Sequence, residues 1–338
     1  MPPLLHDALI DSVPLSFEQT VPRAWVHKRS LDNVLLTEIR PAAPDRFICA
    51  GRIPTAHGFF NDAAGRTPHN DILFYTELGR QASLAMCHAF FDVGTEDVFI
   101  FEGSDAAITE AAWRPGDDTA RDAVAIEIGI PDLTRRKNNA VSRMVTEHTM
   151  WVGTQRVFHG TGAFTIQPAA LFHRLRKAAA ARTPAAVVQE GGVQEGGTDA
   201  PAARVPRASG ANIAISTPRR TATAGEFAAS LIVDRTHPYF FDHPCDHVPG
   251  MLLLEGCAQL ALTTYGETTG TDAAGISAYD VSFSQFVESG IPTTLTAYVD
   301  PQDTTAHDVS RPAVRLIISQ QEAVCGTATL RLALPAAN

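Results

Sequence analysis

Four segments of the chain alternate apolar and polar residues with a period of two. They are rich in β-branched residues and cover positions 124–128, 145–152, 294–299 and 314–318. This period is typical of a strand with one buried face. Two mostly apolar segments, near 72–88 and 251–266, are too long for strands and predict buried helices. Asp71 precedes the first segment as a candidate N-cap, and Pro249-Gly250 forms a turn before the second.

The second half of the chain repeats the polar pattern of the first. The matched pairs are His57 with His237, Phe60 with Phe240, Asp62 with Asp242, His69 with His247, Glu77 with Glu255 and Gln81 with Gln259. In both halves one apolar helix precedes several strands. We therefore predict an α+β protein made of two copies of one domain, each a strongly curved antiparallel sheet around a buried helix. The predicted parts are an N-terminal extension (1–20), a first repeat (21–168), a linker (169–211) and a second repeat (212–334).

The predicted linker changes composition along its length. Residues 171–177 predict a short helix, whereas Val-Gln-Glu-Gly-Gly occurs twice in tandem at 188–192 and 193–197. A Gly-rich stretch of low complexity has few side chains to pack, so we expect a flexible connection there.

Length and composition agree with two globular domains. The chain has 338 residues, which leaves room for two domains of about 150 residues each. Its net charge of −10 argues against a general nucleic-acid surface. No apolar run approaches the roughly eighteen residues of a membrane span, and the N-terminus does not resemble a signal peptide. The five cysteines show no paired spacing, and Cys49, Cys87, Cys257 and Cys325 lie in apolar segments and are expected to be reduced, buried thiols. We predict a cytoplasmic protein with no nucleic-acid or membrane partner.

Two carboxylates lie within the predicted apolar helices. Glu255 is flanked by Leu254 and Gly256, and Glu77 occupies the matching position in the first half. A buried carboxylate is costly unless it is hydrogen-bonded or functional. Because burial raises a carboxylate pKa, either residue is a candidate acceptor of a hydroxyl proton. Arg80 shares a helix face with Glu77, so it either orients Glu77, binds a phosphate, or forms a structural ion pair with it.

Histidines occur in the loops that lead into both predicted helices. His57 and His237 precede aromatic residues, and they either contact a substrate or fix their loops through a ring N–H bond. His243 and His247 lie closer to the second helix and are candidates for a general acid or base.

The loop before the second helix carries further candidate groups. Asp242 and Asp246 are expected to cap turns or orient the histidines. A metal site from His243, Asp246 and His247 is an alternative that the intervening proline disfavours, so we predict no metal. Cys245 beside a histidine is an alternative thioester-accepting nucleophile. Backbone N–H groups at 250–252 are candidates to polarise a thioester carbonyl.

The segment Asp-His-Pro-Cys-Asp-His-Val-Pro-Gly-Met-Leu-Leu-Leu-Glu at 242–255, together with His27-Lys28-Arg29-Ser30-Leu31, resembles the A-factor biosynthesis (AfsA) family. Members of this family carry two hot-dog repeats, and the resemblance covers both halves. It implies an acyltransferase that joins a β-ketoacyl group, delivered on an acyl carrier protein, to the hydroxyl of dihydroxyacetone phosphate. The product leads to γ-butyrolactone- or butenolide-type signalling molecules, and no cofactor is expected. Typical members have Arg where this chain has Ala258, so we expect the two repeats to differ in function.

The segment Gly256-Cys257-Ala258-Gln259 also resembles, more distantly, the hot-dog dehydratases of fatty acid synthesis. Two alternatives therefore stay open: a dehydratase or thioesterase that acts on carrier-bound acyl chains, and a non-catalytic regulator that binds an acyl or lactone ligand.

The resemblance also implies where the active site lies. Hot-dog sites form between paired domains, so we expect an intramolecular pseudo-dimer with the two sheets joined edge to edge, as a monomer or a homodimer. The predicted catalytic residues are Glu77, Arg80 and Glu255. The predicted substrate-binding residues are His57, His69, His237, His243, His247, Gln81 and Gln259.

Overall fold

The computed structural model describes residues 14–62, 70–113, 123–180, 205–243, 245–299 and 312–335. Both predicted apolar helices are present: α2 spans Ile72–Phe90 and α5 spans Gly250–Thr269. The side chain of Asp71 caps α2 by accepting the Leu73 N–H, and Pro249 is the N-cap residue of α5. Both helix starts are therefore confirmed.

The strands form one continuous antiparallel sheet, with six strands from each repeat. The order is β1-β2-β4-β5-β6-β3-β9-β12-β11-β10-β8-β7. The first six are β1 (Leu36–Ala43), β2 (Arg46–Arg52), β3 (Val98–Ile108), β4 (Ala123–Arg135), β5 (Val141–Val152) and β6 (Gln155–Gln167). The second six are β7 (Arg219–Arg220), β8 (Glu226–Ser230), β9 (Gly275–Phe283), β10 (Thr294–Val299), β11 (Ala313–Gln320) and β12 (Ala323–Ala333). All four strands predicted from the alternating pattern are confirmed within β4, β5, β10 and β11.

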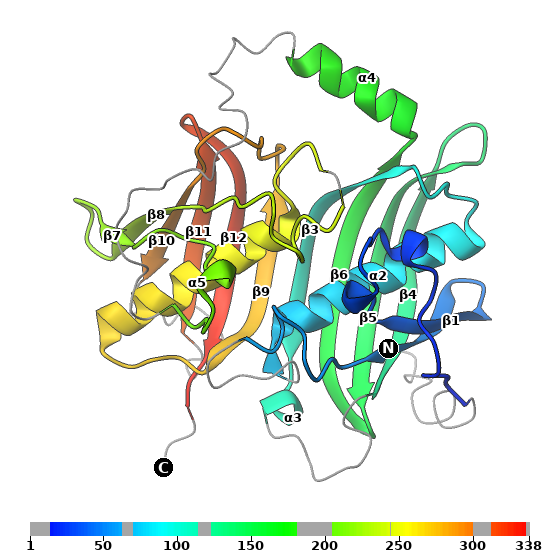
Figure 1. The fold of residues 1–338 in the computed structure, drawn as a ribbon, viewed down its shortest axis with the longest axis horizontal. Helices are drawn as coiled ribbons and strands as arrows, with labels where there is room; N and C mark the ends of the chain where they lie inside the picture. Colours follow the sequence, from blue (N-terminus) through cyan, green and yellow to red (C-terminus); the bar gives the residue numbers. More distant parts are fainter. Residues whose placement is uncertain are drawn as a thin grey trace.

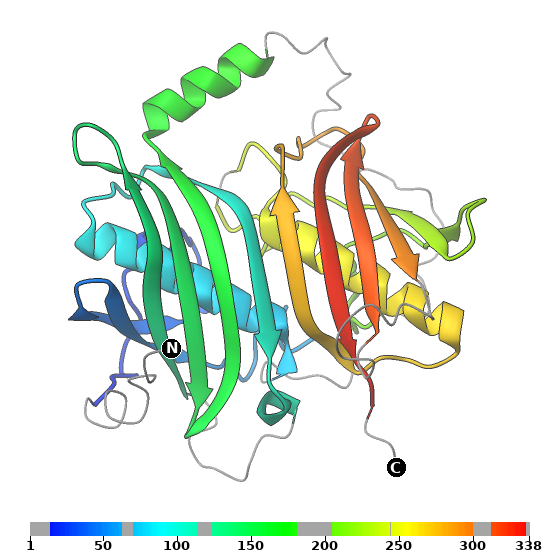
Figure 2. The same ribbon diagram turned by 180° about the vertical axis from the view of Figure 1, so that it is seen from behind.

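The two repeats join through β3 and β9, which pair antiparallel with Asp105 opposite Asp280. Figure 1 shows α2 and α5 side by side on one face of the sheet, and Figure 2 shows the strands in front of both helices. Each helix is buried nearly all round, which explains its continuous apolar sequence. The predicted pair of hot-dog domains, joined edge to edge as a pseudo-dimer, is confirmed.

Shorter elements connect these layers. They are η1 (Arg23–Val26), η2 (Leu31–Asn33), α3 (Glu110–Trp113), α4 (Ala169–Ala180) and η4 (Gly210–Asn212). Helix α4 confirms the helix predicted at 171–177, whereas the tandem repeat at 188–197 lies outside the described residues. No described helix is long and apolar enough to cross a membrane. Cys49, Cys87, Cys257 and Cys325 are free and buried, as predicted, and Cys245 is a partly buried free thiol.

Candidate active site

His57 and His237 fix two symmetric loops between the repeats. The Nε2 atom of His57 lies 2.9 Å from Asn33 Oδ1, while Nδ1 accepts the backbone N–H groups of Phe59 and Phe60. Asn33 in turn donates to the Pro238 carbonyl of the second repeat at 2.9 Å. Burial lowers the pKa of His57 to about 4, so the ring is neutral and both nitrogens are occupied.

The second repeat copies this arrangement. His237 Nε2 lies 2.9 Å from Asn212 Oδ1, and its Nδ1 accepts two backbone N–H groups. Asn212 donates to the Gly58 carbonyl of the first repeat at 2.8 Å. Both rings are used within the protein, and the substrate-binding role of these histidines stays a prediction. Their alternative role, fixing the loops, matches the geometry.

Gln81 and Gln259 are also fully engaged. Gln81 donates to Asn33 O and Glu77 Oε1, both at 2.8 Å, and accepts the N–H of Leu35. Gln259 makes the same set of bonds to Asn212, Glu255 and Ala214. Each amide ties its own helix to the incoming chain, and the predicted contact with substrate stays a prediction.

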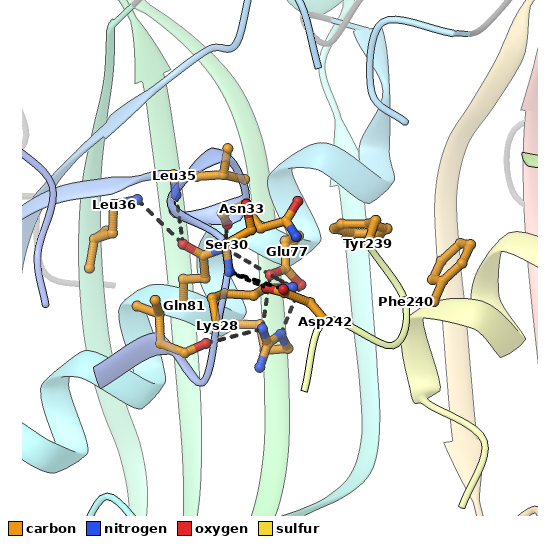
Figure 3. Close-up of polar contacts among 12 residues, drawn as sticks. Lys28, Ser30, Asn33, Leu35, Leu36, Glu77, Gln81, Tyr239, Phe240 and Asp242 are labelled. Atoms are coloured by element: carbon orange, nitrogen blue, oxygen red, sulfur yellow. Dashed lines mark hydrogen bonds and ion pairs between the residues drawn. The ribbon is translucent and has the colours of Figure 1, made fainter. Parts of the chain in front are cut away.

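Glu77 lies in a buried cluster that we call the first site. Its side chain accepts two bonds from Arg80 (2.8 and 2.9 Å) and one from Gln81, and Lys28 Nζ lies 3.2 Å from Oε1 (Figure 3). Burial alone raises a carboxylate pKa, but the charges of Arg80 and Lys28 outweigh it and hold the pKa of Glu77 below its usual range. Glu77 is thus placed as a counterion that orients Arg80 and Lys28, and the proton-accepting role stays a prediction.

Glu255 lies in the corresponding cluster of the second repeat, the second site. Arg207 binds it with two bonds of 2.8 Å, and Gln259 adds a third of 2.6 Å. Glu255 is 2% exposed, so it too is held as one member of a buried ion pair.

Arg207 was missed by the sequence analysis because it lies in the predicted linker. The signal was present in the spacing, since Arg207 precedes Asn212 by as many residues as Lys28 precedes Asn33. The structure supports this match across the repeats. Lys28 lies over the ring of Tyr239 at 4.7 Å, and Arg207 lies over the ring of Phe59 at 4.2 Å.

The two sites therefore differ in their number of cations. In the first site two cations, Lys28 and Arg80, bind Glu77, whereas in the second site Arg207 is the cation that the described residues place against Glu255. Ala258 occupies the position that matches Arg80. There a small pocket remains, lined from both repeats by Asn70, Asp71, Ile72, Leu73, Glu255, Ala258, Gln259, Leu262 and Ile276.

Histidines from both repeats surround Arg80. The side chain of Arg80 is 32% exposed, and its Nη2 also lies 3.5 Å from the Val26 carbonyl. His27 follows Val26 in the chain, and its ring centroid lies 6.5 Å from that of His243 in the second repeat. Burial, together with the charges of Arg80 and Lys28, lowers the pKa of His243 to about 4. The Nδ1 atom of His243 is buried and has no hydrogen-bond partner in the described part of the chain. His243 is thus the predicted histidine that reaches the first site.

His247 belongs to a separate cluster near α4. Its Nδ1 lies 2.7 Å from Asp246 Oδ1, and Arg176 of α4 binds both Asp246 and Glu288. Burial opposes protonation, but bonds to Asp246 and Cys245 raise the pKa of His247 to about 9. Cys245, Asp246 and His247 are the group of possible metal ligands that converges among the described residues, and His243 is not part of it. His69 lies outside the described residues.

The start of α5 offers fewer amides than predicted. The Leu252 N–H donates to Pro249 O at 3.0 Å, so it is not available to a thioester carbonyl. Gly250 packs against the ring of Phe101, which a Cβ atom at this position would contact at 3.0 Å. The N–H groups of Gly250 and Met251 stay as the candidates.

Comparison with known proteins agrees with this architecture. The model of the A-factor biosynthesis hotdog domain matches residues 11–146 and 190–334. The 2-oxo-3-(phosphooxy)propyl 3-oxoalkanoate synthase of Streptomyces virginiae is 30% identical over 242 residues, which cover 72% of this chain and 76% of the relative. The synthase of the same name from Streptomyces coelicolor is 28% identical and covers 85% of both chains. A solved structure described as an oleoyl thioesterase from Lactobacillus plantarum aligns with a TM-score of 0.50 at 15% identity, over 87% of this chain and 98% of that chain, which supports the fold alone.

Proposed function

Because this chain belongs to the A-factor biosynthesis (AfsA) hotdog family, we propose that it transfers a 3-oxoacyl group from a thioester to the hydroxyl of dihydroxyacetone phosphate. The product is a 2-oxo-3-(phosphooxy)propyl 3-oxoalkanoate, a precursor of a butenolide- or γ-butyrolactone-type signal. We assign the reaction to the first site. The observation that carries this assignment is a second cation: Arg80 binds Glu77, although the charge of Lys28 alone would neutralise that carboxylate.

The second site shows how much charge the fold itself needs. There a single guanidinium, that of Arg207, compensates the buried Glu255. In the first site Lys28 occupies the matching position and faces Glu77 at 3.2 Å, so Arg80 is an additional positive charge. The next carboxylate, Asp242, is bound to the backbone N–H groups of Arg29 and Ser30. The charge of Asp242 also acts on Lys28 and Arg80, so the partly exposed guanidinium of Arg80, rather than a net positive charge, is what the first site offers to an anion.

Arg80 is suited to the phosphate of the acceptor. Glu77 holds its Nε and Nη2 atoms, which fixes the plane of the guanidinium and leaves Nη1 for a ligand. The side chain is partly exposed, in contrast to the buried Lys28. A fixed guanidinium binds phosphate with little loss of side-chain entropy.

We assign the proton of the acceptor hydroxyl to a group other than Glu77, because the charges of Arg80 and Lys28 lower the pKa of that carboxylate and make it a weak base. The neutral histidines beside Arg80 are the groups that can accept it. The acyl donor that we propose is an acyl carrier protein thioester, whose flexible arm would deliver the thioester between the two repeats.

The test is mass spectrometry of the purified protein with dihydroxyacetone phosphate and a 3-oxoacyl thioester, given both on a carrier protein and as a small thiol ester. We expect the phosphorylated ester from the wild type and a loss of about 100-fold or more in Arg80→Ala. Arg174→Ala, on the exposed side of α4, is the matched control and should keep its activity with the small thioester. Free 3-oxo acid or a dehydrated acyl chain without ester would instead indicate a thioesterase or a dehydratase, and lactone binding without turnover would indicate a regulator.

A further inference from the structure

His27 and His88 form a hydrogen-bonded pair at the edge of the first site. Their Nε2 atoms lie 3.0 Å apart, and His88 Nδ1 lies 2.9 Å from the Val93 carbonyl. A carbonyl only accepts, so His88 carries its proton on Nδ1. Burial lowers the pKa of His88, so its Nε2 is an unprotonated acceptor. It follows that His27 donates from Nε2 and, as a neutral ring, keeps a lone pair on Nδ1.

The Nδ1 atom of His27 is the free end of this chain of bonds. Within the described residues it makes no hydrogen bond, and His27 is only partly buried. The ring lies against His88, His243 and Phe99, with centroids 5.1, 6.5 and 5.5 Å away. The rings of His27 and His243 therefore meet beside Arg80, one from each repeat.

The backbone of His27 is also unusual. It adopts the left-handed conformation, with φ 53° and ψ 48°, at the end of η1. A residue with a β-carbon occupies this region at a conformational cost, and such residues are concentrated at functional sites. At this position the chain leaves η1. The His27 ring contacts His88, and the next side chain, Lys28, contacts Glu77.

We propose that His27 is the general base of the acyl transfer, accepting the proton of the acceptor hydroxyl at Nδ1, and that His88 is its positioning residue. This assignment rests on the proposed function. As the hydroxyl proton moves to His27 Nδ1, the hydroxyl oxygen bonds to the thioester carbonyl carbon. The tetrahedral intermediate then collapses with cleavage of the C–S bond, and the leaving thiolate takes the proton from Nδ1. The proton thus passes from hydroxyl to thiol, and His27 returns to its neutral form.

The charges around His27 couple this step to binding of the acceptor. Burial, His88 and Arg80 on α2, and His243 from the second repeat lower the pKa of His27 to about 3, so these surroundings favour the neutral ring. A phosphate dianion on Arg80 opposes that positive charge and raises the pKa of His27 again. The base therefore becomes stronger when the acceptor is bound.

The second repeat provides an internal comparison. The positions that match His27 and His88 are Pro206 and Gly266, and the position that matches Arg80 is Ala258. The second repeat therefore lacks both histidines of the pair and the additional cation. It keeps the buried ion pair, the glutamine (Gln259) and the loop histidine (His237). The histidine pair is therefore dispensable for the fold of a repeat, which assigns it to the chemistry of the first site.

The test uses His27→Gly, because glycine adopts the positive φ of this position without strain and the variant should fold. We expect kcat to fall by about 100-fold or more, with phosphate binding retained and with partial recovery on addition of imidazole. His88→Phe should lower kcat less, and ¹⁵N spectra of the labelled ring should show His27 losing its single Nε2–H tautomer. His173→Ala, an exposed histidine on α4, is the matched control.

The outcomes separate this proposal from the function on which it rests. If the wild type forms the ester and His27→Gly is equally active, or if His243→Gln alone abolishes kcat, the assignment of His27 is overturned while the synthase stands. If the wild type forms no ester under any condition, both fail. An Nδ1–H tautomer of His27 in the wild-type spectrum would also overturn the assignment.

Discussion

Arg207→Ala removes the cation that binds Glu255 among the described residues of the second site. Arg207 makes two bonds of 2.8 Å to Glu255 and one of 2.9 Å to the Phe59 carbonyl of the other repeat. Without it, Glu255 stays 2% exposed with Gln259 as its remaining hydrogen-bond donor among the contacts described above. Breaking a buried ion pair from one side costs about 3–5 kcal/mol, because an uncompensated charge is left inside. A total stability of roughly 5–15 kcal/mol makes this a large fraction.

The second site offers its own rescue. Ala258 lies three residues after Glu255, the spacing of Arg80 after Glu77, and it lines the small pocket described above. Arg207→Ala combined with Ala258→Arg therefore restores a guanidinium to the same carboxylate from the helix. We expect the double variant to recover most of the lost free energy of unfolding.

Urea unfolding followed by circular dichroism measures both effects. If the free energy of unfolding falls with urea concentration at the same slope in each variant, the variants expose the same surface on unfolding and can be compared. Arg174→Ala on the exposed face of α4 is the control and should change stability by less than about 0.5 kcal/mol. A loss below about 1 kcal/mol in Arg207→Ala would refute the argument that this buried ion pair stabilises the folded protein. So would a double variant that is as unstable as the single one.

Three further predictions concern individual groups. The pKa of Glu77 is lowered in the folded protein, so the stability that this carboxylate contributes is present above its ordinary pKa of 4.5 and is lost as the pH falls below that value. Glu77→Gln should therefore make the free energy of unfolding less dependent on pH at acid pH. An unchanged pH dependence would contradict the ion pair. His57→Ala and His237→Ala each leave one asparagine Oδ1 atom and two backbone N–H groups without their histidine partner and should each lower the free energy of unfolding in urea by about 1–3 kcal/mol. An effect on KM with no loss of stability would instead support the substrate-binding role. Arg80 helps to lower the pKa of His27 and His243, so Arg80→Gln should move the acidic limb of kcat/KM to higher pH, and a limb that stays in place would show that neither ring is the base.

The fold could be predicted from the sequence because its signals are local. Alternation with period two marks β4, β5, β10 and β11, and an apolar run too long for a strand marks α2 and α5. Glu77 and Arg80 are likewise close in sequence, so their pairing follows from helix geometry. The matched polar residues of the two halves then indicated the duplication.

The functional differences between the sites depend on contacts between distant segments. His27 meets His88 across 61 residues and Arg207 meets Glu255 across 48, and no periodicity relates them. Arg207 was hidden by its neighbours, whose composition predicts a linker. The pKa of Glu77 could not be predicted because burial and two cations act in opposite directions, and only the structure shows that the cations prevail.

The most direct test of the account is single-turnover formation of the phosphorylated 3-oxoacyl ester by the wild type, Arg80→Ala and the double variant Arg207→Ala with Ala258→Arg. If the first site performs the chemistry and the second is structural, the double variant forms ester at nearly the wild-type rate while Arg80→Ala is slower by about 100-fold or more. Full activity in Arg80→Ala, or loss of ester in a folded double variant, would place the reaction elsewhere and contradict the account.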